Sequence, residues 1–384
     1  MIRKKHPIIK RTVFALLAAC ICLACSACGG NPTEENGVPS VGGLKYESTV
    51  PLKYADQFDI YRFEGGYSLI DLHESDTILV VPEGKDPPDG LDDDIVVIRK
   101  PLENIYLAAT SAMALFDSID ALDAISFAGS DKWYIDSAEA ALESGDMVYA
   151  GKYSAPDYEM LIDGGCRLAI QSTMILHTPE VREKLIELGI STIVERSSYE
   201  DHPLGRTEWV KVYGALLGKE TEAEVAFEKE AAMVSELESL DPTGKTAAFF
   251  YVNAAGNVVT YKYSGYVPAM IRIAGGIYVP ADAGADNPNK LSTVNMSMEE
   301  FYNSAKDADF IIYSCSIASQ LHSMDELLEL SPVLENFKAV KNGNAWCTTE
   351  SMFQQTDKMG TIINEMNMIF TGQADSLRYM FRLD

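Results

Sequence analysis

Short runs rich in β-branched and aromatic residues alternate with polar turns in the first part of the chain. The runs FDIYRF, YSLIDL, TILVV and IVVIR lie between residues 58 and 99. Turn residues separate them, above all in PEGKDPPDGLDDD. This pattern is typical of strands joined as hairpins. We therefore expect hairpins at the edge of a sheet here.

After residue 101 the pattern changes to apolar strand-like runs that alternate with helix-like runs. The strand-like runs are IYLAA, AISFAG, RLAIQS and STIVE, and the runs between them include TSAMALFDSIDAL and TPEVREKLIELG. The same alternation restarts at KTAAFFYVN and continues to a helix from about Gln354. Strands that alternate with helices over short connections indicate parallel βαβ units.

A long helical stretch, TEAEVAFEKEAAMVSELESL, separates the two α/β regions. Among its many acids, Val225, Phe227, Ala232, Val234 and Leu237 form an incomplete apolar stripe, so much of this helix should face water. The sequence therefore predicts an α/β protein: two Rossmann-like lobes with mainly parallel sheets, joined by a long α-helix. We expect lobes at 51–218 and 242–384, with the helix at 219–241.

The N-terminus has the composition of a secretion signal. A basic stretch is followed by an apolar run that is too short to span a bilayer and ends in small residues and cysteine. The sequence CSACGG resembles the lipobox of bacterial lipoproteins, which predicts a signal peptide over 1–28 and a lipid on Cys28. Cys25 and Cys20 are alternatives, as is plain secretion with free cysteines. Residues 29–50, rich in Gly, Pro, Ser and Asn, are expected to form a flexible tether.

Charge and motif content narrow the possible functions. The 384 residues include 31 Lys and Arg against 57 Asp and Glu, a net charge of −26, which argues against nucleic-acid binding through the general surface. The histidines are scattered and no metal-ligand spacing, nucleophile motif or phosphate loop is present, so we predict no metal, no cofactor and no enzyme. Cys166, Cys315 and Cys347 could form at most one disulfide, and small buried thiols are the simpler interpretation.

Candidate ligand contacts lie just after the predicted strands, where side chains project into the cleft of an open α/β sheet. Aromatic and hydroxyl side chains there would suit a large, partly apolar organic ligand. The same side chains would also fit local packing. The candidates are Trp133, Tyr134, Thr173, Glu195, Arg196, Tyr261, Tyr263, Ser264 and Phe353.

The stretch ERSSYEDHPLGRTEW, residues 195–209, carries charges of both signs between a strand and a helix. Glu195 and Arg196 end the strand and should point toward the cleft. Asp201 or His202 can cap the next helix, and Pro203 fits its first turn because the missing N–H costs nothing there. We expect a cleft-edge loop joined to a helix cap rather than a catalytic loop.

Several strings together resemble a known family, the substrate-binding proteins of bacterial ABC importers that capture ferric siderophores, haem and cobalamin. The strings are APDYEML, IVERSSYEDHPLGRTEWVKVYGALLGKE, MIRIAGG, SMEEFYNSAKDADFIIY and QQTDKMG, and the resemblance covers nearly everything from about residue 101 to the C-terminus. The segment 51–100 departs from the plainest members.

The resemblance implies a lipid-anchored, monomeric receptor on the extracytoplasmic face of the membrane. It would deliver a ferric siderophore, haem or corrinoid to the transmembrane subunits of an ABC permease. Family members dock through one surface glutamate on each lobe, and the matching positions are Glu159 and Glu299, with Glu300 as the alternative. A receptor for free divalent metal, or an enzyme or sensor that reuses the fold, are the competing functions.

Overall fold

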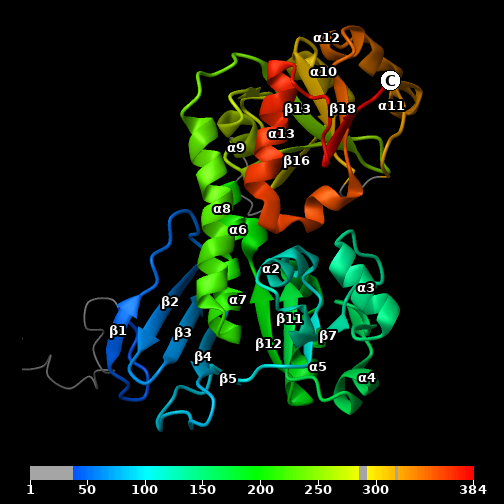
Figure 1. Ribbon diagram of the computed structural model, residues 1–384. Helices are drawn as coiled ribbons and strands as arrows, with labels where there is room; N and C mark the ends of the chain where they lie inside the picture. The colour runs from blue at the N-terminus through cyan, green and yellow to red at the C-terminus, as the bar shows by residue number, and fades with distance from the viewer. Residues whose placement is uncertain (1–37, 285–291, 316–318) are drawn as a thin grey trace, which may run out of the picture. The chain divides into compact units, whose positions relative to one another are not determined.

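The structure is a computed structural model that describes residues 38–284, 292–315 and 319–384 (Figure 1). The chain divides into two units, residues 1–44 with 88–91, and Lys45–Pro87 with Asp92–Asp384. In the first unit the backbone turns after Val41, whose side chain is buried. The lipidation candidates Cys20, Cys25 and Cys28 lie outside the described residues. The second unit holds three sheets of five or more strands.

The first of these sheets is built from the hairpins of the N-terminal segment. Ile60, Ile70 and Ile78 stand opposite one another on three strands and are buried in the same core as Phe227 of the long helix. One face of these strands packs against helices, and the strands form a sheet of their own instead of the expected edge of a larger sheet. Four strands are antiparallel neighbours, namely β1 (Tyr46–Thr49), β2 (Phe58–Phe63), β3 (Tyr67–Leu72) and β4 (Thr77–Val81), and β5 (Val96–Arg99) is parallel to β4.

The second sheet is parallel throughout and has the order β12-β11-β6-β7-β8. Leu168 pairs with Ile105 on one side and Ser191 on the other. Helices follow its strands, as predicted for βαβ units. The strands are β6 (Ile105–Leu107), β7 (Ile125–Ala128), β8 (Val148–Tyr149), β11 (Leu168–Ser172) and β12 (Ser191–Glu195); the helices are α2 (Met113–Ser118), α3 (Asp136–Ser144), α4 (Tyr158–Asp163) and α5 (Pro179–Glu187); β9 (Gly151–Lys152) and β10 (Ala155–Pro156) form a small hairpin.

Three consecutive helices connect the second sheet to the third: α6 (Pro203–Glu208), α7 (Val210–Leu217) and α8 (Glu220–Glu238). The 19 residues of α8 contact α2, α6 and α7 as well as α9 and α13 (Figure 1). Its buried face starts at Ala223 and continues at intervals of three or four residues through Phe227, Val234 and Leu237. The expected stripe was therefore partly wrong, because Val225 is 67% exposed and Ala232 also faces water.

The third sheet is mixed, with the order β16-β14-β13-β17-β18-β19. Its centre, β13, β17 and β18, is parallel, whereas β14, β16 and β19 are antiparallel to their neighbours. The α/β class of the prediction is confirmed. The strands are β13 (Thr246–Val252), β14 (Val258–Tyr261), β15 (Ile277–Tyr278, on β13), β16 (Thr293–Met296), β17 (Phe310–Tyr313), β18 (Ala345–Thr348) and β19 (Met380–Arg382); the helices are α9 (Tyr266–Ile273), α10 (Met298–Ala305), α11 (Met324–Leu330), α12 (Lys338–Lys341) and α13 (Met359–Thr371).

The structure agrees with two expectations from the local sequence, the capping box at residues 297–300 and the buried free cysteines. Ser297 and Glu300 form a reciprocal capping box at the start of α10. The three described cysteines are free and buried, so the described chain has no disulfide. Short 3₁₀-helices complete the connections: η1 (Thr110–Ala112), η2 (Leu122–Ala124), η3 (Thr173–His177), η4 (Ser197–Tyr199), η5 (Pro332–Asn336), η6 (Glu350–Gln354) and η7 (Thr356–Lys358).

Candidate functional site

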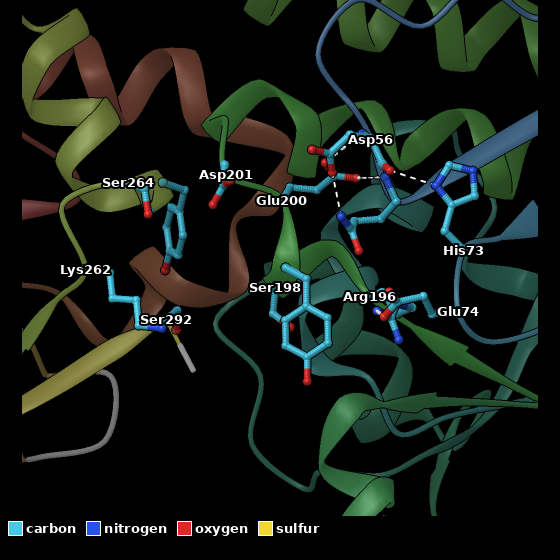
Figure 2. Close-up of a pocket in the computed structure, with 14 residues that line it drawn as sticks. Asp56, His73, Glu74, Arg196, Ser198, Glu200, Asp201, Lys262, Ser264 and Ser292 are labelled. Atoms are coloured by element: carbon cyan, nitrogen blue, oxygen red, sulfur yellow. Dashed lines mark hydrogen bonds and ion pairs between the residues drawn. The ribbon is translucent and has the colours of Figure 1, made fainter. Parts of the chain in front are cut away.

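A cavity of about 430 Å³ lies beyond the carboxyl end of β12, where segments from all three sheets meet. Figure 2 shows His73, Glu74 and Arg196 on one side of it and Lys262, Ser264 and Ser292 on the other. The cavity is the kind of cleft in which open α/β sheets bind ligands. The full lining is Asp56, Gln57, His73, Glu74, Arg196, Ser198, Tyr199, Glu200, Asp201, Lys262, Ser264, Gly265, Tyr266 and Ser292.

The end of β12 places two charged side chains differently. Glu195 is buried, and its carboxylate accepts hydrogen bonds from the backbone N–H of Ser197 (2.9 Å) and the hydroxyl of Ser111 (3.0 Å). Arg196 lines the cavity, its guanidinium 4.9 Å from the ring centre of Tyr199. Of the two residues predicted to point into the cleft, Glu195 is thus engaged in the local loop, whereas Arg196 is in the wall.

Glu200 is a buried carboxylate that connects this loop to the segment before β2. It accepts hydrogen bonds from the backbone N–H groups of Asp56 (2.9 Å) and Gln57 (3.2 Å) and from the indole N–H of Trp209 (2.9 Å). Burial raises the pKa of Glu200 to about 7, against the opposing effect of the Asp56 and Trp209 hydrogen bonds. Glu200 is therefore a proton-sensitive anchor for the part of the wall that Asp56 and Gln57 form.

The turn between β3 and β4 contributes His73 and Glu74. The His73 ring nitrogens lie 2.8 Å from the carbonyl oxygen of Asp56 and 3.0 Å from a carboxylate oxygen of Asp59. Burial by itself would lower the pKa of His73, but these two hydrogen bonds and the Asp59 charge outweigh it and raise the pKa. Glu74 has a φ of 55°, in the left-handed region that few non-glycine residues adopt, and its carboxylate lies 3.6 Å from Arg196. Strained backbone of this kind is concentrated at functional sites.

The opposite wall belongs to the connection between β14 and α9. Lys262, Ser264 and Tyr266 line it, and Tyr266 is fixed by the guanidinium of Arg206, 4.3 Å from its ring centre. Burial raises the pKa of Asp201, an effect that the charge of Asp56 increases and that of Lys262 opposes. The wall thus carries charges of both signs around a polar cavity.

The helix start after this loop agrees with the sequence analysis. Nδ1 of His202 accepts a hydrogen bond from the backbone N–H of Leu204 (3.1 Å), and Pro203 occupies the first turn of α6. Burial lowers the pKa of His202, whose ring stacks on Tyr54 at 4.3 Å. Trp209 packs into the core. His202, not Asp201, is therefore the cap.

Only two of the predicted cleft residues, Arg196 and Ser264, line this cavity. Trp133 is buried, with its indole N–H donated to the carbonyl of Ser130 (3.1 Å). Tyr261 is buried between Phe249 and Tyr266, Tyr263 is 41% exposed beneath Arg272, and Thr173 is half-buried in η3.

Tyr134 and Phe353 lie at a different contact between the two halves. The backbone N–H of Tyr134 donates to the side chain of Gln354 (2.8 Å), and Gln355 donates to the carbonyl of Tyr134 (3.2 Å). Lys132 and Glu350 add an exposed ion pair at 3.3 Å. Phe353 is half-buried against the large core. This contact joins the loop after β7 directly to η6.

Sequence reasoning missed the contribution of the antiparallel sheet, namely Asp56, Gln57, His73 and Glu74. The one local signal was the polar turn HESD between two strand-like runs. Nothing in that turn says which other loop it meets.

The two predicted docking residues are exposed on separate helices. Glu159 lies in the first turn of α4 and Glu299 in the first turn of α10. Glu300 accepts hydrogen bonds from Ser297, which lower its pKa, so its carboxylate is committed to the cap. Glu300, the alternative docking residue, is thus engaged in the capping box, whereas Glu299 takes no part in it.

The described residues contain no group of three or more His, Cys, Asp or Glu side chains arranged to hold a metal ion. No helix in the same part of the chain combines the length and apolar composition needed to cross a membrane.

Comparison with known proteins adds a family and a shared fold. Residues 118–350 match the sequence profile of a family described as periplasmic binding protein. An uncharacterized lipoprotein of Methanocaldococcus jannaschii is 26% identical over 334 residues, which cover 79% of this chain and 77% of that protein. A periplasmic haem-binding protein from Pseudomonas aeruginosa superposes with a TM-score of 0.58 at 13% identity, covering 73% of this chain and 98% of the other. A petrobactin-binding protein from Bacillus subtilis gives a TM-score of 0.56 at 13% identity, with 71% and 93% covered.

Proposed function

Because the chain belongs to the periplasmic binding protein family, we propose that it captures a metal chelate outside the cytoplasm and delivers it to an ABC import permease. The ligand class is a ferric siderophore, haem or corrinoid. The observation that carries the proposal is the cavity at the carboxyl end of β12, which both halves of the chain line. The fold shared with a haem-binding and a petrobactin-binding protein supports the same class.

The binding test is a panel of chelates added to the purified protein. Haem, cobalamin and several ferric siderophores are titrated, and binding is followed by thermal shift and by absorbance. At least one should raise the unfolding temperature in a concentration-dependent way, because a ligand that binds only the folded state stabilises it. No binding together with a hydrolytic activity would overturn the receptor function, and binding of free divalent metal alone would favour the metal-receptor alternative.

The proposal includes a lipid anchor at Cys28, with residues 29–50 as the tether and a monomeric body. The Methanocaldococcus jannaschii relative is named a lipoprotein, which supports this part. Two acyl chains are sufficient for stable attachment to a membrane. Cys28→Ala should move the protein from the membrane fraction to the soluble fraction. A variant that stays with the membrane would direct attention to Cys25 or Cys20.

The proposed lobes, 51–218 and 242–384, would move only slightly about the helix 219–241. The support is that α8 packs against helices of both halves, and that the loop at Tyr134 is hydrogen-bonded to η6. Binding then amounts to a small closure around a largely preformed cavity.

Docking to the permease is assigned to Glu159 and Glu299. Two exposed carboxylates can contact two basic pockets of a partner, which improves orientation and association rate more than affinity. Replacing both by Arg should abolish uptake while chelate binding is unchanged. The same change at Glu183 and Glu335, exposed on other helical segments, is the control. Normal uptake by the double variant would remove the docking assignment.

A further inference from the structure

The described part of the cavity wall carries more negative than positive charge. Asp56, Glu74, Glu200 and Asp201 supply four carboxylates, whereas the cations among the described lining residues are Arg196 and Lys262. His73, the remaining titratable imidazole, is turned into hydrogen bonds with Asp59 and the Asp56 carbonyl. A ligand in this cavity therefore meets a negative field.

The two cations are already compensated by carboxylates of the same wall. The Arg196 guanidinium lies 3.6 Å from Glu74 and stacks on Tyr199. The charge of Lys262 opposes the rise in the pKa of Asp201, and both residues lie on the wall drawn in Figure 2. By contrast, Asp56 has no ion-pair partner in the described chain, and its carboxylate accepts from the side-chain amide of Gln57. Glu200 adds less charge, because burial raises its pKa to about 7. The uncompensated charge of the wall is thus negative.

Two of the four carboxylates come from outside the part of the chain that matches the family profile. Asp56 precedes β2, and Glu74 occupies the β3–β4 turn, both before residue 118. Glu74 keeps an unfavourable left-handed backbone there. These two acidic groups therefore reach the cavity from residues that lie outside the matched family segment.

Resting on the proposed function, we propose that the ligand is a chelate without net negative charge, and that Asp56 and Glu74 impose this selection. Ferric tris-hydroxamates are neutral or cationic and corrinoids present amide groups, and both can donate N–H to the wall carboxylates. Tris-catecholate complexes are trianionic, and haem carries two propionates, so like-charge repulsion would exclude the first and weaken the second.

The test titrates three ferric chelates by fluorescence quenching. Ferrioxamine B carries an additional ammonium group, ferrichrome is neutral, and ferric enterobactin is trianionic. The first two should bind at least about thirtyfold more tightly than the third at low salt, and the difference should shrink in high salt.

Substitutions test which residues cause the difference in affinity between the chelates. The double variant D56N/E74Q should narrow the difference by about tenfold or more, because it removes two charges and leaves Arg196 uncompensated. Glu64→Gln, an exposed acid at the other end of the same sheet, is the control and should leave it unchanged. Preferential binding of the trianionic chelate, or an unchanged preference in the double variant, would overturn the inference and leave the receptor function standing. Failure of every chelate to bind would overturn both.

Discussion

Residues 53–57 are hydrogen-bonded to two buried glutamates, one at each end of the segment. The two glutamates have different electrostatic surroundings. Glu208 accepts the backbone N–H groups of Lys53, Tyr54 and Ala55, at 2.8–3.0 Å, and pairs with the buried Lys211 at 3.0 Å. Glu200 accepts the N–H groups of the next two residues and an indole N–H, with no cation beside it in the described chain.

This difference makes Glu208 a structural anchor and Glu200 an anchor whose charge depends on pH. A buried carboxylate with a cation partner is strongly dependent on that partner, and the converse also holds. A buried carboxylate with only neutral donors retains its proton more readily, and this one forms part of the cavity wall. Both lie in the stretch 195–209, the predicted cleft-edge loop and helix cap. Its charges also attach the antiparallel sheet to the cavity.

The largest expected effect is at Glu208. Glu208→Ala should lower the free energy of unfolding by about 3–5 kcal/mol, because Lys211 is left buried without its main partner and three N–H groups lose their acceptor. Urea unfolding measures the change. Glu224→Ala is the matched control, since Glu224 contacts the same Lys211 at 3.2 Å but is half exposed, and its loss should be below about 1 kcal/mol. Equal losses would remove the distinction between anchor and surface pair.

Glu200 should make stability depend on pH. Its pKa is about 7 in the folded protein and near 4.5 when unfolded, so between these values the folded state keeps a proton that the unfolded state has released. The stability from this group is complete below about pH 4.5 and is lost as the pH rises to about 7, a change of about 3 kcal/mol. The free energy of unfolding of Glu200→Gln should vary less between pH 5 and 8 than that of the unsubstituted protein. Parallel profiles would contradict the assignment.

Gly205 tests how closely α6 approaches the anchored segment. A Cβ atom at this position would lie 3.0 Å from a Glu200 carboxylate oxygen and 3.1 Å from the Tyr54 carbonyl oxygen. Gly205→Ala should therefore cost about 1–3 kcal/mol, although the same change in an open helix gains up to about 1 kcal/mol. Thermal unfolding would detect a loss or a gain of stability, and a gain would mean that residues 53–57 can move away from the added Cβ atom.

The smallest effect is expected at the exposed start of the segment. Lys53 also pairs with Glu228 of α8, and both side chains are about half exposed. Glu228→Gln should change the free energy of unfolding by less than about 1 kcal/mol, because solvent and salt screen such pairs. A loss comparable to that of Glu208→Ala would show that the ion pair, and not the buried acceptor, holds residues 53–57.

Much of the fold could be predicted because its signals are local. The βαβ alternation after residue 101, the capping box at Ser297 and the start of α6 at Pro203 each depend on neighbouring residues. The cleft aromatics were harder, because a side chain after a strand can face either the cleft or the core. Trp133 and Tyr261 went to the core, whereas Arg196 and Ser264 reached the cavity.

The sequence by itself determined the α/β class, the long connecting helix and the family, because periodicity, caps and family strings lie within short windows of the chain. Only the tertiary structure decided that hairpins 46–99 form their own sheet and bring Asp56 and Glu74 to Arg196. That meeting joins residues more than a hundred positions apart. The segment that carries Asp56 is held by the buried acceptors Glu200 and Glu208, largely through backbone N–H groups that every non-proline residue carries and no sequence pattern distinguishes.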